Sequence, residues 1–232
     1  QMSIYNRSQD KTTALTDKGA IWCESPAAVA AQSDIVFSIV GFPDDVRGVL
    51  LGPKGVIQGG RAGQIIVDMT TSSPALAQEI DAAARAKEMA TLDAPVSGGD
   101  IGARNGSLAI MVGGAPETFE TVLPLFEIMG ENIQLMGPAG AGQHTKMCNQ
   151  ILIAGTMIGV VESLLYAHRV GLDAKAVIGV IGKGAAASWS INNLGPRIAD
   201  GDFDPGFYIK HFVKDMGIAL EEARRLNLSL PG

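Results

Sequence analysis

The sequence predicts an α/β protein, with a doubly wound, mostly parallel sheet followed by an all-α domain. Short β-rich runs alternate with amphipathic helical windows over residues 1–137. Several of these runs are continuously apolar, as expected of strands whose two faces are both covered. Beyond residue 138 only helical periodicity remains. Alternating strands and helices are typical of a parallel sheet with helices on both of its faces.

The elements follow from this alternation. Strands are predicted at residues 2–6, 34–40, 64–70, 91–96, 107–113 and 132–136, and helices between them at 11–18, 25–32, 43–51, 74–87 and 115–129. The helices of the second domain are predicted at 143–170, 174–183, 188–199 and 212–226. Gly171 and Gly201 indicate helix ends, because each precedes an aspartate that can cap the next element. We therefore divide the chain into domains at 1–137 and 138–232.

Both ends of the sequence depart from a complete domain. A doubly wound nucleotide-binding domain normally opens with a strand, a Gly-x-Gly-x-x-Gly turn and a helix. This sequence opens with a segment, residues 2–8, that is typical of the second strand of such a domain. It ends in a turn signal at Leu230, Pro231 and Gly232. We expect the first domain to lack its first strand and Gly-rich turn, and the second domain to be incomplete at its C-terminus.

The composition excludes several classes of protein. Apolar residues make up 47% of the chain and charged residues 18%, which suits a well-packed globular protein. The net charge of −6 gives no support for binding to nucleic acid or to an anionic membrane. Two distant cysteines, no signal-peptide pattern and an apolar stretch of only 151–161 favour a cytoplasmic protein that crosses no membrane. The three histidines lack metal-ligand spacing, so no metal is predicted.

The strongest local signal is a lysine within an apolar helix. Lys146, Asn149 and Gln150 stand at positions i, i+3 and i+4 of the predicted helix, so they share one face with Gln143 one turn earlier. A lysine in such surroundings either extends its ammonium group to solvent or enters a polar cavity. A solvated lysine near a helix start is the ordinary explanation. The neighbouring amide side chains favour a cavity.

Two further motifs come directly after predicted strands. Ser97, Gly98 and Gly99 could present a hydroxyl and accessible backbone N–H groups to an anion, although an ordinary Gly-rich turn has the same sequence. Thr71 stands at the carboxyl end of another strand, where doubly wound sheets bind their ligands. A fourth motif, Phe207 to Asp215 with Lys214, could equally be the solvated face of a helix.

Taken together and in this order, the four motifs resemble the 3-hydroxyisobutyrate dehydrogenase (β-hydroxyacid dehydrogenase) family. The resemblance covers essentially the whole chain, and its spacing is specific: 26 residues separate Thr71 from Ser97, and 49 more lead to Lys146. The resemblance implies a Rossmann-type domain that binds NAD or NADP, followed by a helical domain. It also implies a small carboxylate substrate and a homodimer or homotetramer.

The resemblance also implies a role for each motif. Lys146 would exchange a proton with the substrate oxygen as general acid and base. Ser97, Gly98 and Gly99 would bind the substrate carboxylate, with Asn149 orienting the substrate; Gln150 stands where many members have a second asparagine, so its part in substrate binding is open. The residues implied on the cofactor side are Asn6, Arg7, Ser8, Thr71, Phe207, Lys214 and Asp215. Because Asn6, Arg7 and Ser8 lack the acidic residue that reads the ribose of NAD, NADP is favoured.

The expected activity is hydride transfer between the cofactor and a short β-hydroxyacid or semialdehyde, such as 3-hydroxyisobutyrate, tartronate semialdehyde, glyoxylate or succinic semialdehyde. A free lysine has a pKa of about 10.4, so a lysine base needs burial or a neighbouring cation to work near neutral pH. The alternatives are an imine reductase on the same scaffold and a non-catalytic oligomerisation or binding module. Lys146 disfavours the imine reductase, and Lys146 together with the Ser-Gly-Gly turn disfavours the non-catalytic module. A Rossmann-type methyltransferase would leave the helical domain and its lysine without a function.

Overall fold

The structure, a computed structural model, describes all residues from 1 to 232 and divides into two compact units. Unit 1 is Gln1–Lys146 and unit 2 is Met147–Gly232. The division falls within helix α8 (Ala141–Arg169). The reason is local, because the first turn of α8 is hydrogen-bonded to the strands of unit 1.

The main sheet of unit 1 has the strand order β3-β4-β5-β7-β6, and β8 also pairs with β7. Its strands are β3 (Ile35–Ser38), β4 (Ile65–Asp68), β5 (Ala90–Asp93), β6 (Val96–Ser97), β7 (Leu108–Gly114) and β8 (Gly130–Gly137). Strands β3, β4 and β5 are parallel, as are β7 and β8, whereas β7 is antiparallel to β5 and β6. The sequence does not predict this antiparallel insertion.

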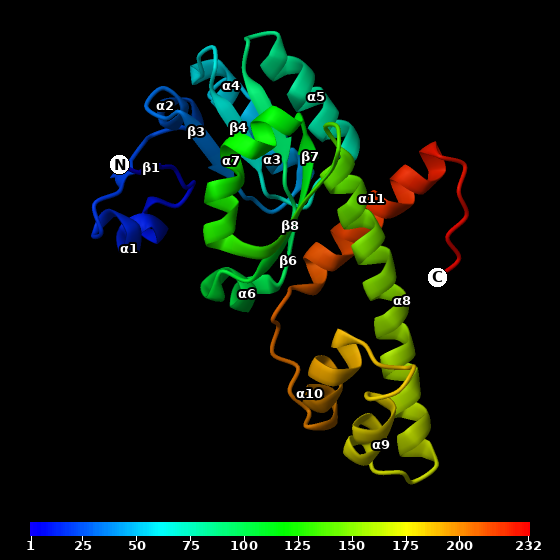
Figure 1. Ribbon diagram of the computed structural model, residues 1–232. Coiled ribbons are helices and arrows are strands. Elements are labelled where there is room, and N and C mark those ends of the chain that lie inside the picture. Colours follow the sequence, from blue (N-terminus) through cyan, green and yellow to red (C-terminus); the bar gives the residue numbers. More distant parts are fainter. The chain divides into compact units, whose positions relative to one another are not determined.

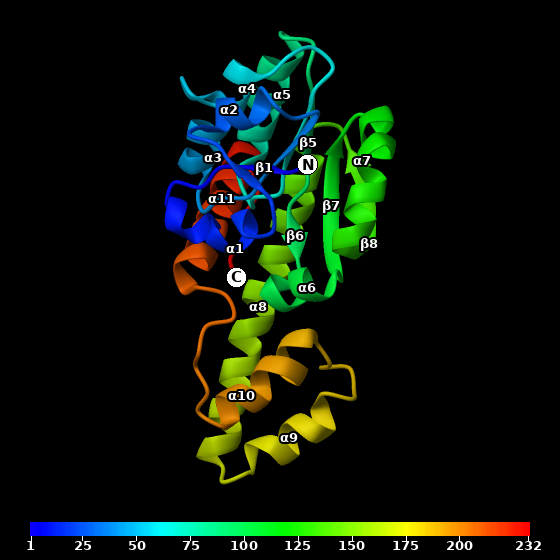
Figure 2. The same cartoon turned by 90° about the vertical axis from the view of Figure 1, so that its left-hand side faces the viewer.

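Helices cover both faces of the sheet (Figures 1 and 2). One face carries α2 (Pro26–Ala30), α3 (Pro43–Leu51), α4 (Val56–Gly59) and α5 (Pro74–Arg85), and α7 (Pro116–Met129) packs on the other. Adjacent strand residues point to opposite faces. Accordingly Ile66 joins the core under α2–α5, while Val67 joins the core under α7 with Phe126. The predicted doubly wound α/β architecture is confirmed.

The predicted strand at 91–96 is two strands in the structure. β5 ends at Asp93 and β6 starts at Val96, and both pair with β7. Pro95 lies between them and has no N–H to donate, so it interrupts the ladder. Helix α6 (Gly99–Asn105) follows at once. The bend at Pro95 places the Ser-Gly-Gly turn at the start of a short helix, which periodicity did not predict.

The N-terminal segment forms a separate two-stranded sheet. β1 (Ser3–Ile4) pairs in parallel with β2 (Ile21–Trp22), and between them lie the 3₁₀-helix η1 (Gln9–Thr12) and helix α1 (Thr13–Thr16). Strand β2 is too short for a period-2 pattern to reveal it. The segment places the predicted ribose-binding residues 6–8 one residue after the end of β1.

Unit 2 consists of helices. They are α8 from Met147 onward, α9 (Ala174–Ile181), the π-helix η2 (Ser190–Leu194), α10 (Gly195–Ala199) and α11 (Ile209–Arg225). Gly171 adopts a φ of +77°, and the Asp173 carboxylate caps α9 by accepting the N–H of Ala176 at 2.7 Å. These are the helix end and the cap that the sequence predicts. Val160, Leu164, Ile178 and Ile191 form one core, among α8, α9, η2 and α10. Met147 of α8 packs with Ile218 and Ala219 of α11 in a second core.

Helix α8 is long and apolar enough to cross a membrane by length and composition alone, with a mean hydropathy of 1.6 over its most apolar window. Of that window, 17% is buried inside the chain. One such helix is weak evidence of a membrane span, since the mostly buried core helix of a water-soluble protein passes the same test. The apolar run 151–161 singled out in the sequence is only part of this helix.

Candidate functional site

The first turns of α8 lie against the carboxyl ends of β4 and β5 within unit 1. Each oxygen of the Asp93 carboxylate accepts one backbone N–H at the start of α8: Oδ1 from Gly140, the residue before the helix, at 2.7 Å and Oδ2 from Gln143 at 2.8 Å. The Lys146 ammonium, one turn further along α8, donates to the carbonyl of Val96 at 2.9 Å. Residues 93–96 therefore hold the start of α8 at two points.

Lys146 is 6% exposed and is thus buried in the structure. Its acceptor, Val96, directly precedes Ser97, so the ammonium group lies beside the Ser-Gly-Gly turn. A buried ammonium group requires polar partners, because moving it away from water unpaired is costly. The structure therefore brings together the two strongest motifs of the sequence, the lysine and the turn.

The turn itself has a backbone that favours glycine. Gly98 and Gly99 adopt φ values of +131° and +63°, which residues with a side chain rarely adopt. A β-carbon on Gly98 would also lie 3.1 Å from Cδ2 of Leu108. Helix α6 begins at Gly99, and the first N–H groups of a helix have no partner within it. Ser97 is half-buried, and together these groups could bind an anion.

Two glycines allow the close approach of α8 to the sheet. A β-carbon on Gly142 would lie 2.4 Å from the Met111 carbonyl oxygen and 2.5 Å from that of Asp93. A β-carbon on Gly113 would lie 2.5 Å from Oδ1 of Asp93. No side chain fits at either position, so the backbone of α8 contacts the strands directly.

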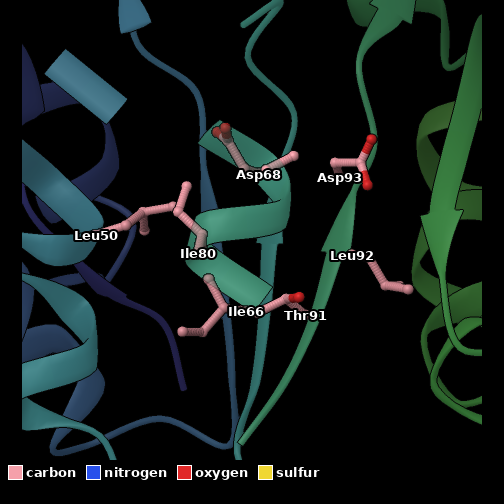
Figure 3. A pocket seen from close by; sticks show the side chains of 8 residues that line it. Leu50, Ile66, Asp68, Ile80, Thr91, Leu92 and Asp93 are labelled. Atoms are coloured by element: carbon pink, nitrogen blue, oxygen red, sulfur yellow. The ribbon is translucent and has the colours of Figure 1, made fainter. Parts of the chain in front are cut away.

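Asp93 is buried and lies in register with Asp68 on the neighbouring strand. Burial raises the pKa of Asp93 from 3.8 to about 6; the backbone N–H groups of Gly140 and Gln143 oppose this increase, and the charge of Asp68 adds to it. Figure 3 shows both aspartates beside a small cavity between β4, β5 and α5. Its volume of about 10 Å³ has room for roughly one water molecule. It is too small to be the ligand site.

Gln143 is a functional candidate that was not among the site residues predicted from the sequence. Its side chain is fully buried; its Nε2 donates to the Thr70 carbonyl at 2.7 Å and its Oε1 accepts the N–H of Ser72 at 2.9 Å. These two bonds flank Thr71, so Gln143 holds the backbone on both sides of that residue. A buried amide following Gly140 and Gly142 at the start of an apolar helix was the signal available in the sequence.

Asp68 organises the same strand end. Its Oδ1 accepts the hydroxyl of Ser38 at 2.9 Å and both the N–H and the hydroxyl of Thr70, at 3.2 and 2.8 Å. The Thr70 hydroxyl oxygen in turn accepts the N–H of Val40 at 2.9 Å. The carboxyl ends of β3 and β4, where Thr71 lies, are therefore held by buried hydrogen bonds.

Within unit 2, Gln150 contacts Asp215. The Gln150 amide donates to Oδ2 of Asp215 at 2.6 Å, and Oδ1 of Asp215 lies 3.1 Å from the Lys214 ammonium. The side chains of Asp215 and Lys214 are 1% and 10% exposed. The aspartate thus links two residues that the sequence assigned separately to substrate and cofactor binding.

The other predicted residues lie in more open surroundings. Asn149 is half-buried, and Phe207 is 55% exposed with its ring 6.1 Å from that of His211. Asn6 and Ser8 are half-buried next to β1. The Arg7 side chain is 87% exposed, with its guanidinium group 3.8 Å from Asp45. No group of three or more His, Cys, Asp or Glu residues is arranged to hold a metal ion.

Comparison with known proteins places this arrangement in a family. Residues 1–137 match the NAD binding domain of 6-phosphogluconate dehydrogenase, and residues 140–232 match the NAD-binding domain of NADP-dependent 3-hydroxyisobutyrate dehydrogenase. A probable mitochondrial 3-hydroxyisobutyrate dehydrogenase-like protein of Arabidopsis thaliana is 53% identical, covering 100% of this chain and 69% of its own length. The 2-hydroxy-3-oxopropionate reductase of Escherichia coli is 41% identical, covering 94% and 74%.

A solved structure shows the same fold. The 3-hydroxyisobutyrate dehydrogenase of Mycobacterium tuberculosis, determined with L-serine, superposes with a TM-score of 0.89 at 29% identity, covering 98% of this chain and 79% of that one. Both halves of the sequence therefore match domains of nicotinamide-dependent enzymes that act on hydroxyl groups. The chain belongs to the 3-hydroxyisobutyrate dehydrogenase family of hydroxyacid dehydrogenases.

Proposed function

We propose that the protein catalyses reversible hydride transfer between NADP and a short carboxylic acid that bears a β-hydroxyl group, or the corresponding semialdehyde. The observation that supports this most strongly is the buried Lys146 ammonium at 2.9 Å from the carbonyl next to Ser97. A carboxylate bound at the turn would bring a hydroxyl two carbons away close to the ammonium group. The compounds in the names of two relatives, 3-hydroxyisobutyrate and 2-hydroxy-3-oxopropionate, belong to this class.

Each residue has a part in this reaction. Ser97, with the backbone N–H groups of Gly98 and Gly99, binds the carboxylate and sets the distance to the reacting carbon. Lys146 takes the hydroxyl proton during oxidation and returns it during reduction. Asn149, one turn along α8, orients the substrate oxygen. When bound, the nicotinamide supplies or accepts the hydride.

The site residues fit a nicotinamide cofactor at the carboxyl ends of the parallel strands β3 and β4. Buried hydrogen bonds from Asp68 and Gln143 hold the backbone on both sides of Thr71, the residue that we place beside the nicotinamide. Phe207, Lys214 and Asp215 complete the cofactor side in this proposal, and Gln150 contributes by holding Asp215. Arg7, with Asn6 and Ser8, is placed at the adenosine ribose, where a guanidinium group favours the 2′-phosphate of NADP.

Exposed apolar side chains on α8 support a homo-oligomer. Leu152, Leu165 and Tyr166 are 70%, 59% and 70% exposed in the single chain. Burial of such side chains against a second copy would remove apolar surface from water. Sedimentation of the full chain measures this directly, and a monomer at micromolar concentration would contradict it. The two free cysteines agree with the cytoplasmic location that we propose.

The experiment compares the wild type with Lys146→Ala in the absorbance of the nicotinamide. The wild type is incubated with NADPH and a panel of semialdehydes and glyoxylate, with a cyclic imine as the probe of the alternative reaction. We expect turnover of a semialdehyde, and a decrease in kcat of about 100-fold or more in the variant. Lys87→Ala is the matched control, because Lys87 also donates to a backbone carbonyl, that of Ile57, away from the site.

Near-normal turnover by Lys146→Ala would refute the assignment of the lysine. Turnover of the imine but of no semialdehyde would favour an imine reductase. No turnover of any substrate by a protein that carries the complete cofactor-binding domain would leave the non-catalytic binding module as the better hypothesis.

A further inference from the structure

The segment from Asp93 to Ser97 connects the catalytic lysine to the substrate turn. Asp93 binds the first turn of α8 through both carboxylate oxygens, and three residues later the Val96 carbonyl accepts the Lys146 ammonium. Ser97 follows directly. Within unit 1 the position of the ammonium relative to the turn therefore depends on how α8 is attached to residues 93–96.

The attachment at Asp93 requires a carboxylate. Two N–H donors converge on it, from Gly140 and Gln143, and each oxygen accepts one of them. The helix cannot move closer, because the β-carbon positions of Gly113 and Gly142 are already filled by neighbouring atoms. An asparagine of the same shape would offer one acceptor and would direct an NH₂ group at the second N–H.

We propose that Asp93 is a positioning residue: by anchoring the first turn of α8 it sets the distance between the Lys146 ammonium group and the Ser97–Gly98–Gly99 turn. The catalytic part of this inference rests on the proposed function, whereas the anchoring part can be tested without it. A displacement of about 1 Å between reacting groups can reduce turnover by about 100-fold, so the anchor matters even though Asp93 touches no substrate.

The same geometry makes the anchor sensitive to pH. A protonated carboxyl group keeps one acceptor oxygen and turns the other into a donor, so it can satisfy only one of the two N–H groups. Burial raises the pKa of Asp93 to about 6. Among the elements around it, β4 contributes the ionisable Asp68, the first turns of α8 contribute the exposed His144 and then Lys146, α5 contributes Asp81, and β7 contains no ionisable side chain.

The kinetic test uses Asp93→Asn in the full chain. We expect kcat to fall 10- to 100-fold while KM for the carboxylate substrate changes less than threefold, since the turn itself is intact. In the wild type, kcat should fall below about pH 6, and the variant should lack this decrease because residue 93 no longer titrates. If Asp93 had only a structural role, its substitution would lower kcat at every pH and would leave the decrease in kcat below pH 6 in place. Unchanged kcat, or the same acid limb in the variant, overturns the proposal.

Asp81→Asn is the matched control. Asp81 is also a carboxylate largely buried in unit 1 and accepts the Thr91 hydroxyl of β5 at 2.8 Å, but it has no bond to α8. Its substitution should leave both kcat and the acid limb as in the wild type. If kcat fell as far in Asp81→Asn as in Asp93→Asn, any buried carboxylate beside β5 would have the same effect on turnover. That result would overturn the proposal.

Amide hydrogen exchange tests the anchor independently of catalysis. We expect the protection factors of the Gly140 and Gln143 amides to fall at least tenfold in Asp93→Asn and to be unchanged in Asp81→Asn. If Asp93→Asn does not fold, the wild type alone can test the anchor. The protection factors of its Gly140 and Gln143 amides should then fall as the pH is lowered from 7 to 5. Unchanged protection overturns the anchor. A wild type without turnover but with this exchange pattern refutes the proposed function alone.

Discussion

Replacing Gly142 by alanine tests the close contact between α8 and the sheet. The added β-carbon would lie 2.4 Å from the Met111 carbonyl oxygen and 2.5 Å from that of Asp93. Both are backbone atoms and cannot rotate away, so the start of α8 must shift outward. Overpacking of this kind costs about 1–3 kcal/mol.

The shift also weakens the two hydrogen bonds to the Asp93 carboxylate from Gly140 and Gln143, and bonds to charged groups contribute about 1.5–3 kcal/mol each. Because partial relaxation keeps some of both contributions, we expect Gly142→Ala to lower the free energy of unfolding of unit 1 by about 3–5 kcal/mol. Gly48→Ala in α3 is the matched control, since no atom lies within 4 Å of its β-carbon position. It should raise that free energy by about 0.5–1 kcal/mol through helix propensity.

The assay is urea denaturation followed by tryptophan fluorescence. Trp22 lies in unit 1 and Trp189 in unit 2, so a Trp189→Phe background restricts the signal to unit 1. The free energy follows from the midpoint and the slope of the transition. A Gly142→Ala protein within about 0.5 kcal/mol of the wild type, the range of an ordinary surface substitution, would refute the claim that α8 contacts the strands at van der Waals distance.

Two further predictions concern Asp93 and Arg7. The pKa of Asp93 is about 6 in the fold, raised by burial from 3.8; the folded state therefore binds more protons than the unfolded state between these values, and the contribution of Asp93 to stability decreases as the pH rises through this window. The free energy of unfolding of the wild type, minus that of Asp93→Asn, should fall by about 2 kcal/mol from pH 4 to pH 6.5, and stability curves that run parallel over this range would contradict it. Arg7→Ala should raise KM for NADPH severalfold with little effect on KM for NADH, and equal effects on both would refute the preference for NADP.

Much of the fold could be predicted from local pattern. Continuous apolar runs revealed β3 and β4, and the Asp173 cap with Gly171 revealed the start of α9, because these signals act within a few residues. Strand β2 and helices α4 and α6 were not predicted, since two to seven residues are too few for a period to emerge. The sequence shows a proline at position 95 but not that it divides two strands. That division depends on the distant strand β7, with which both β5 and β6 pair.

The candidate site shows the same distinction. Lys146, Ser97 and the two following glycines were identified because chemically unusual residues stood in regular surroundings, an ammonium group in an apolar helix and a hydroxyl before a Gly-Gly turn. Gln143 was not included, because its partners at Thr70 and Ser72 lie 73 and 71 residues away. Nothing in the local sequence of an amide shows which distant backbone groups it will bind.

The sequence by itself determined the alternation of strands and helices, the helical second half and the residue types that carry the chemistry. The tertiary structure decided the antiparallel insertion of β7, the register that sets Asp68 beside Asp93, and the anchoring of α8 by that second carboxylate. The physical reason is range: propensity and periodicity act between near neighbours in the chain, whereas strand pairing and buried hydrogen bonds join groups separated by tens of residues. Only the folded chain brings such groups within hydrogen-bonding distance of one another.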